Sequence, residues 1–254
     1  MTLTASMFLI VCPLAFLAGF LDSIAGGGGM ITLPAYYLAG LPPALAAGTN
    51  KMSASMGAVV ATLNYAKAKK IDYRIGIPAV AGALVCGTLG ALVLTSLPQN
   101  VVRILVLCCI PVAAAFTLRK PKLRESRTLG EKAMLILSLL VGCAIGFYDG
   151  LIGPGTGTFL ILLFMQIFRM EAVQASGTAK IVNLASNVAA LLSMIFTGNV
   201  LFLLGIPAGV CTMVGAHFGS RMTIKKGGKL IRLMMIVVLA LLLLKILADI
   251  VFPS

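Results

Sequence analysis

Apolar residues dominate the chain in long runs that short polar stretches separate. A membrane-spanning helix needs about 20 apolar residues, and most of these runs reach that length. They occupy residues 7–25, 30–40, 43–66, 75–96 and 100–118, followed by 133–150, 158–168, 171–198, 201–221 and 230–251. This pattern predicts an all-α integral membrane protein with about eight to ten membrane-embedded helical segments.

The sequence also repeats itself, which predicts two structurally equivalent halves. Residues 19–22 (GFLD) return as residues 146–149 (GFYD), and residues 48–51 (GTNK) return as residues 177–180 (GTAK). Further matched pairs, in the same order, are Gly76 with Gly205, Gly90 with Gly219, and Arg103 with Arg232. The predicted organisation is a first transmembrane repeat over 1–118, a basic cytoplasmic linker over 119–132 and a second transmembrane repeat over 133–254.

Basic residues indicate the orientation of the halves, because lysine and arginine gather in cytoplasmic loops. The loop at residues 67–74 carries four of them, whereas its second-half equivalent at residues 198–199 has no charge. The next loop shows the reverse, since residues 96–100 are uncharged and their equivalent around residues 221–232 is basic. Equivalent loops are therefore predicted on opposite sides of the membrane, which is an inverted-repeat topology, with both termini outside.

The second apolar run of each half is short and follows a glycine cluster. Eleven residues of helix extend roughly 16 Å, about half of a 30 Å hydrocarbon core. The predicted orientation also requires the first two runs of each half to begin and end on the same side. A glycine-broken re-entrant hairpin fits this better than two full spans, and a tilted pair of spans is the alternative.

Composition narrows the class of protein further. Hydrophobic residues make up 60% of the chain and charged residues 11%, against about 45–50% and about 25% in soluble domains. The net charge of +13 is explained by cytoplasmic loops, and no basic stretch is interleaved with aromatic residues as on a nucleic-acid surface. The six cysteines lie in apolar runs without CxxC spacing and there is one histidine, so neither a metal site nor a cofactor is expected. The sequence contains no HExxH or GxSxG motif, so an enzyme is not expected either.

The two glycine clusters are candidate binding elements. They consist of Gly26, Gly27, Gly28 and Gly29 in the first half and of Gly153, Gly155 and Gly157 in the second. Each cluster leaves backbone N–H groups free at the start of a short helix, where unpaired donors and the helix dipole favour an anion. The alternative is that the glycines only allow helices to pack closely.

Two lysines inside apolar runs extend this candidate site. Lys51 and Lys180 lie about eight or nine residues into equivalent helices, where a charge is costly and is usually functional. Alternatively, each side chain extends to the interface or pairs with a carboxylate. Neighbouring polar residues complete the predicted anion-binding set, which adds Thr49, Asn50, Thr178, Asn183 and Asn187.

Two aspartates precede the glycine clusters. Asp22 and Asp149 either pair with the lysines in a structural role or titrate and couple transport to protons, and the structural role is preferred. His217 is interpreted as a packing or hydrogen-bonding residue rather than a proton relay.

These motifs resemble the sulfite exporter TauE/SafE family, also called the toluene sulfonate uptake permease family. The resemblance is carried by residues 19–29 (GFLDSIAGGGG), 48–51 (GTNK), 146–150 (GFYDG) and 177–180 (GTAK). It implies a bacterial or archaeal plasma-membrane protein that moves sulfite, organosulfonates or related small anions, coupled to an ion gradient. The second glycine cluster departs from a pure glycine run at Pro154 and Thr156, which puts equal contributions of the two halves in doubt.

Residues and resemblance together predict a multi-pass secondary transporter that moves a small anion by alternating access, with proton coupling as an option. An anion channel and a transporter of a non-sulfur carboxylate anion are the alternatives. The expected partners are the small anionic substrate, for which sulfite or an organosulfonate is favoured, and the lipid bilayer. A homodimer is left open, and nucleic acid is not an expected partner.

Overall fold

The computed structural model describes residues 4–96, 130–151 and 153–251. Within these residues every regular element is a helix and none is a strand, which confirms the predicted all-α class. In chain order the helices are α1 (Ala5–Ala25), α2 (Gly29–Leu38), α3 (Pro43–Lys67), α4 (Tyr73–Ser96), α6 (Glu131–Leu151), α7 (Thr156–Ile167), α8 (Ala172–Phe196), α9 (Phe202–Lys226) and α10 (Gly228–Val251). The predicted run at 100–118 and almost all of the predicted linker lie outside the described residues.

Five of these helices are long and apolar enough to cross a membrane, namely α1, α4 over Tyr73–Leu94, α6, α8 and α9. Their outer faces expose large apolar side chains such as Leu9 and Leu203, as expected where lipid is the solvent. The chain is therefore a multi-pass membrane protein. By contrast α2 and α7 have 10 and 12 residues and extend only roughly 15 and 18 Å. They have the predicted half-length, and their re-entry into the membrane stays a prediction.

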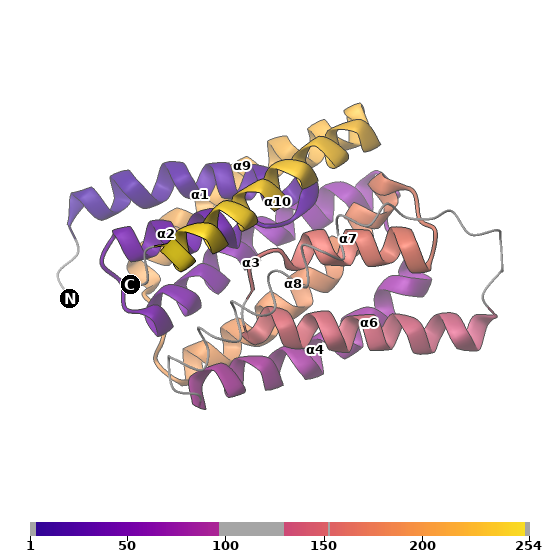
Figure 1. The fold of residues 1–254 in the computed structure, drawn as a ribbon, viewed down its shortest axis with the longest axis horizontal. Coiled ribbons are helices and arrows are strands. Elements are labelled where there is room, and N and C mark those ends of the chain that lie inside the picture. The colour runs from indigo at the N-terminus through magenta and orange to yellow at the C-terminus, as the bar shows by residue number, and fades with distance from the viewer. Residues whose placement is uncertain (1–3, 97–129, 152, 252–254) are drawn as a thin grey trace.

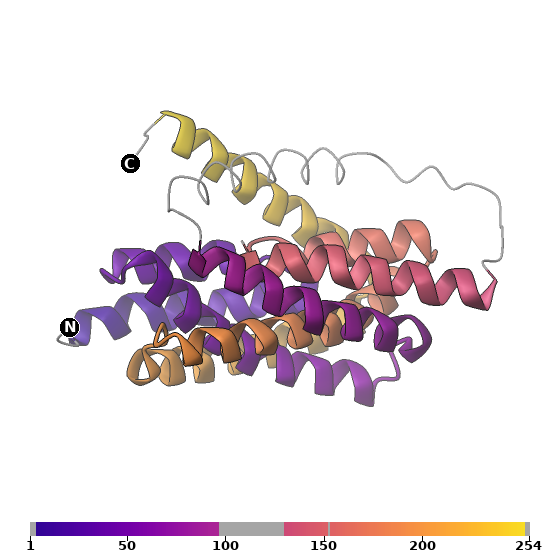
Figure 2. The same ribbon diagram turned by 90° about the horizontal axis from the view of Figure 1, so that it is seen from below.

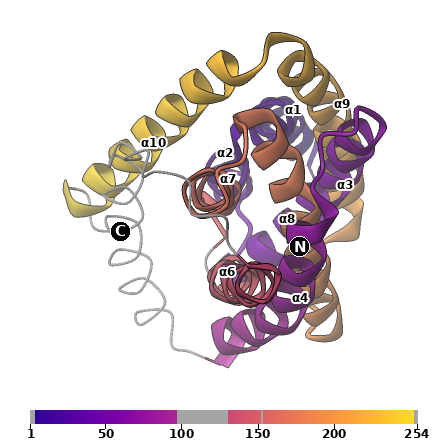
Figure 3. The ribbon, with the colours of Figure 1, turned by 90° about the vertical axis from the view of Figure 1, so that its right-hand side faces the viewer.

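The long helices form a bundle (Figure 1). The end-on view shows α1, α3 and α9 on one side and α4 and α6 on the other (Figure 3). Helix α8 contacts members of both groups, because it packs against α3, α4 and α6. Helix α10 lies on the outside and leans away from the bundle towards the C-terminus (Figure 2). The two groups are therefore connected mainly through α8 and α3.

Packing partners are exchanged between the two halves. Helix α1 of the first half packs against α9 of the second, and the equivalent helix α6 packs against α4. A Cβ atom on Gly219 would overlap the carbonyl oxygen of Phe20, and one on Gly90 would overlap that of the equivalent Phe147. Small residues allow such close backbone contact between membrane helices. The sequence repeat thus corresponds to a repeated helix interface, whereas the sides of the membrane that the loops face stay a prediction.

The largest apolar cluster lies around α7. It contains fully buried side chains from α7, α1 and α10, among them Leu160, Phe164, Ile24 and Val238. Burial of each such side chain stabilises the fold by about 1.5–3 kcal/mol in water, but in lipid close packing replaces the hydrophobic effect as the main gain. This cluster holds the short helix and the glycine turn before it in place.

Candidate functional site

Both glycine clusters form turns that join a long helix to a short one. Gly26 and Gly153 occupy equivalent positions and have φ values of 81° and 86°, which a residue with a side chain rarely adopts. The two turns also touch each other. A Cβ atom on Gly26 would overlap the backbone of Gly157 and Thr158, and the Thr158 hydroxyl donates a 2.7 Å hydrogen bond to the carbonyl of Ala25. Gly26 and Gly157 therefore have the packing role that was the alternative.

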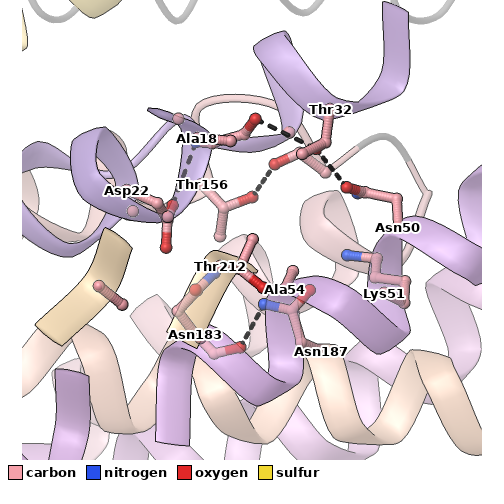
Figure 4. A pocket seen from close by; sticks show the side chains of 18 of the residues that line it. Ala18, Asp22, Thr32, Asn50, Lys51, Ala54, Thr156, Asn183, Asn187 and Thr212 are labelled. Atoms are coloured by element: carbon pink, nitrogen blue, oxygen red, sulfur yellow. Dashed lines mark hydrogen bonds between the residues drawn. The ribbon is translucent and has the colours of Figure 1, made fainter. Parts of the chain in front are cut away.

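A small cavity of about 40 Å³ lies beside these turns, between the middle parts of α3 and α8 (Figure 4). This volume has room for one or two water molecules. Predicted site residues that line it are Gly27, Gly28, Gly29, Asn50, Lys51, Gly153, Gly157, Asn183, Asn187, Asp22 and Asp149. Further lining residues are Ala18, Gly19, Thr32, Ala54, Gly57, Thr156, Thr212 and Ala216. The repeat interface thus brings most of the predicted site together.

The other predicted residues do not line the cavity. The hydroxyl oxygens of Thr49 and Thr178 accept 3.0 Å hydrogen bonds from the backbone N–H groups of Leu201 and Asp72. These donor N–H groups lie at the starts of α9 and α4, so both threonines secure equivalent helix ends in the opposite half. Gly155 caps the start of α7 with a left-handed backbone. Lys180 is fully buried behind the cavity wall.

The two lysines and two aspartates form crossed ion pairs between the halves. Lys51 Nζ lies 3.0 Å from an Asp149 carboxylate oxygen, and Lys180 Nζ lies 2.7 Å from an Asp22 carboxylate oxygen. Each pair therefore joins a lysine of one half to an aspartate of the other, which is the pairing preferred from the sequence. A buried lysine and a buried carboxylate each need such a partner, because either charge alone is costly in a low-dielectric interior.

The two ion pairs differ in how completely they are enclosed. Asp149 also accepts hydrogen bonds from the hydroxyls of Thr156 and Ser186, at 2.8 and 2.6 Å, and its side chain is 2% exposed. Lys51 Nζ donates a further 2.7 Å hydrogen bond to the Asp149 backbone carbonyl. Among the described residues, the Asp22 carboxylate accepts one other hydrogen bond, from the Gly28 N–H at 3.2 Å, and the Asp22 side chain is 23% exposed.

Several hydrogen-bond donors at the cavity have no acceptor among the described residues. The Asn50 side-chain oxygen accepts a hydrogen bond from the Thr32 hydroxyl, which leaves the Asn50 NH₂ group near Gly29. The Asn183 side-chain amide and the backbone N–H groups of Gly29 and Gly157 have no hydrogen-bond partner in the described part of the chain. Converging amide donors near an ammonium group suit an oxyanion.

Sequence reasoning missed several polar lining or supporting residues. Thr156 occupies the repeat position of Gly29, and that departure from the glycine run was a signal for its role. Ser186 lies three residues after Asn183 and therefore on the same face of α8. Thr32 and Thr212 gave no signal, because threonine hydroxyls are common in membrane helices and bond to the carbonyl four residues earlier, as both do here.

The sequence comparisons agree on one family. The family model described as "Sulfite exporter TauE/SafE" matches residues 11–246. A probable membrane transporter protein, ORF9, of a Sinorhizobium species is 38% identical over 97% of this chain and 94% of its own length. The probable membrane transporter protein YfcA of Escherichia coli K12 is 36% identical over 92% of this chain and 87% of its own.

A third relative, a probable membrane transporter protein of Haemophilus influenzae, is 31% identical over 98% of both chains. No solved structure matches the chain. The match over nearly the whole length, together with the multi-pass helical fold, shows that this protein belongs to the sulfite exporter TauE/SafE family of membrane transporters.

Proposed function

We propose that this protein is a secondary transporter of a small oxyanion, with sulfite or a small organosulfonate as the favoured substrate. The observation that carries the proposal is a group of amide donors beside the Lys51 ammonium group, for which the described residues provide no acceptor. These donors belong to Asn50, Asn183, Gly29 and Gly157. Hydrogen bonds from such donors to an anion are stronger than those between neutral groups. The family name supports a sulfur oxyanion.

The lining favours a small cargo. Its described residues are glycine, alanine, threonine, asparagine and three charged residues, and they include no aromatic or large apolar side chain. Sites for larger organic ligands are lined mainly by apolar and aromatic side chains. An inorganic anion or a very small sulfonate therefore fits better than an aromatic sulfonate.

Alternating access is the transport mechanism that this arrangement supports. A cavity of about 40 Å³ is smaller than a hydrated oxyanion, so the substrate reaches the site only when surrounding helices move. The cavity lies between α3 and α8, which are equivalent helices of the two halves. Inverted-repeat transporters move one repeat against the other around such a site. We propose the same movement here, with the two halves in opposite orientations.

The test is uptake into proteoliposomes of labelled sulfite, sulfate, thiosulfate, methanesulfonate and taurine, with acetate as a carboxylate. We expect saturable uptake of at least one sulfur oxyanion. No uptake of any sulfur anion by folded protein would contradict the proposal, and uptake of acetate alone would replace the substrate class. Flux that does not saturate, with single-channel conductance, would indicate the anion channel.

Two asparagine variants locate the site. Asn183→Ala removes an amide at the cavity, so we expect the apparent affinity to fall about tenfold or more, as for a hydrogen bond to a charged group. Asn199→Ala is the matched control, because Asn199 does not line the cavity and its side chain, among the described residues, bonds only to Thr197 nearby in the chain. Equal affinities of the two variants would show that the anion binds elsewhere.

A further inference from the structure

The charges at the cavity sum to zero. Asp22, Asp149 and Lys51 line it, and Lys180 pairs with Asp22 from behind the wall. No other acidic or basic side chain of the described residues lines the cavity. A monovalent anion that arrived alone would therefore leave a net negative charge in a buried site, next to two carboxylates. Such an uncompensated charge is costly, and binding a proton at the same time removes it.

We propose that Asp22 binds one proton together with the transported anion, while Asp149 stays ionised throughout the cycle. This inference rests on the proposed function and adds the residue that couples the anion to the proton. On binding, one proton from the aqueous phase adds to a carboxylate oxygen of Asp22. On release, the proton and the anion leave on the other side of the membrane, so one proton moves with each anion.

The surroundings of Asp149 exclude it from this role. Its carboxylate accepts hydrogen bonds from Thr156 and Ser186 in addition to the Lys51 ammonium group, and it is almost fully buried. Three donors thus occupy most of the roughly four acceptor positions of this carboxylate, and its burial restricts access to the remaining one. The Lys51 ammonium group is also held by the Asp149 backbone carbonyl. This ion pair therefore acts as a fixed part of the cavity wall.

Asp22 is the more accessible of the two carboxylates, and fewer donors hold it. Its side chain is 23% exposed and has one ion-pair partner and one long hydrogen bond, from Gly28. A proton on Asp22 weakens its contacts with Lys180 and Gly28, and it frees for the anion the N–H group of Gly28, a residue that lines the cavity. The buried Lys180 ammonium group lies behind Asp22 and adds its positive charge to the site without lining the cavity. Figure 4 shows Asp22 and Lys51 on opposite sides of the cavity, so an anion between them would have the Lys51 ammonium group on one side and the Asp22 carboxyl group, which Lys180 contacts, on the other.

No other titratable group takes this position. Helix α1 packs against α2, α3, α7, α8, α9 and α10. The titratable and charged residues with described side chains on these helices are Tyr36, Tyr37, Lys51, Tyr65, Lys67, Lys180, Cys211, His217, Arg221, Lys225, Lys226, Lys229 and Arg232. Tyr65 donates its hydroxyl to the Ser23 carbonyl, and His217 contacts Asn64. Within this set Lys180 alone forms an ion pair or hydrogen bond with Asp22.

The test compares Asp22→Asn with wild type in proteoliposomes, with methanesulfonate as the probe. This anion keeps a single negative charge between weakly acidic and neutral pH. If one proton binds with each anion, the apparent affinity of wild type rises by up to about tenfold for each unit by which the pH falls. In Asp22→Asn, which resembles the protonated form, we expect less than about a twofold change over the same range. A pH gradient should drive accumulation of the anion in wild type and not in the variant.

Control variants keep the result interpretable. Asn183→Ala should weaken binding at every pH and keep the wild-type pH dependence, because its side chain does not titrate. Asp22→Glu keeps a carboxylate and should retain the pH dependence. If Asp22→Asn does not fold, the double variant Asp22→Asn with Lys180→Met removes both charges of the pair and takes its place. An anion would then leave a net negative charge in the site at every pH, so we expect uptake with a weaker apparent affinity than in wild type and without pH dependence.

The outcomes separate this inference from the proposed function. If folded wild-type protein takes up none of the anions tested, the proposed function is refuted. If wild type takes up an anion and Asp22→Asn keeps the wild-type pH dependence of uptake, only the role of Asp22 is refuted. Accumulation in wild type that follows a sodium gradient and ignores the pH gradient also overturns the inference, because it identifies another coupling ion.

Discussion

The buried ion pair between Lys51 and Asp149 makes a quantitative prediction about stability. Lys51→Met leaves the Asp149 carboxylate with two hydroxyl donors, from Thr156 and Ser186. Asp149→Asn removes the carboxylate and leaves the Lys51 ammonium group bonded to the backbone carbonyl of residue 149. Removing one partner of a buried pair costs about 3–5 kcal/mol, because the other charge stays buried. We expect each single variant to lose about that much free energy of unfolding. The double variant should lie within about 2 kcal/mol of wild type, because no uncompensated charge is left.

The assay is reversible unfolding in mixed micelles of a mild and a denaturing detergent. The chain has no tryptophan, so helix content by circular dichroism is the appropriate signal. A coupling free energy between the two positions follows from the four proteins of the cycle. The second pair provides the comparison: Lys180→Met should cost less than Lys51→Met, because the Asp22 carboxylate is partly exposed.

Two results would refute this reasoning. If the losses of the single variants simply add in the double variant, the two residues do not compensate each other in the folded protein. If Lys180→Met costs as much as Lys51→Met, the difference in exposure of the two aspartates has no energetic effect, and the argument that separates Asp22 from Asp149 loses its support.

Two further predictions concern packing and helix ends. Gly142→Ala should destabilise the protein by about 1–3 kcal/mol in the same assay, because its Cβ would overlap the Ala79 carbonyl at the α4–α6 contact; Gly130→Ala, with open space around it, is the control and should have little effect. Thr178→Val should cost about 1 kcal/mol through loss of the hydrogen bond to the Asp72 N–H, and equal stability of the variant and wild type would contradict that role. Transport by Thr178→Val should keep the wild-type apparent affinity, as measured in proteoliposomes.

Much of the fold could be predicted because apolar runs in lipid have few alternatives to helices. The predicted runs in the described residues correspond to α1–α4 and α6–α10, with ends displaced by a few residues. The exchange of packing partners could not be predicted, because the repeat indicates which helices are equivalent and not which ones touch. That α1 packs on α9 depends on contacts between residues almost 200 positions apart, such as Gly19 and Thr212.

The candidate site shows the same limit at single residues. Asn183 and Asn187 were identified from their helical spacing, and both line the cavity. Thr49 and Thr178 were included because the repeat preserves them, and the structure instead places them at helix starts. A residue that the repeat preserves can thus have a packing role as well as a binding role. Asp149 is held more tightly than Asp22 because the hydroxyl groups of Thr156 and Ser186 donate hydrogen bonds to it. No feature of the first-half sequence corresponds to these two hydroxyl groups.

The crossed ion pairs have a consequence for synthesis of the chain in the membrane. Lys51 precedes Asp149 by 98 residues, and Asp22 precedes Lys180 by 158. Protein synthesis adds about 5–20 residues per second. The ion-pair partner of Lys51 is therefore synthesised roughly 5–20 s after Lys51, and the partner of Asp22 roughly 8–30 s after Asp22. During that interval the first half carries two unpaired charges and lacks the partners of α1 and α4. The inserted first half is therefore not yet in its final packing. Synthesis of the second half supplies both counter-charges and completes both helix interfaces. A chain that ends before α6 contains Lys51 and Asp22 but neither of the residues that pair with them in the folded protein.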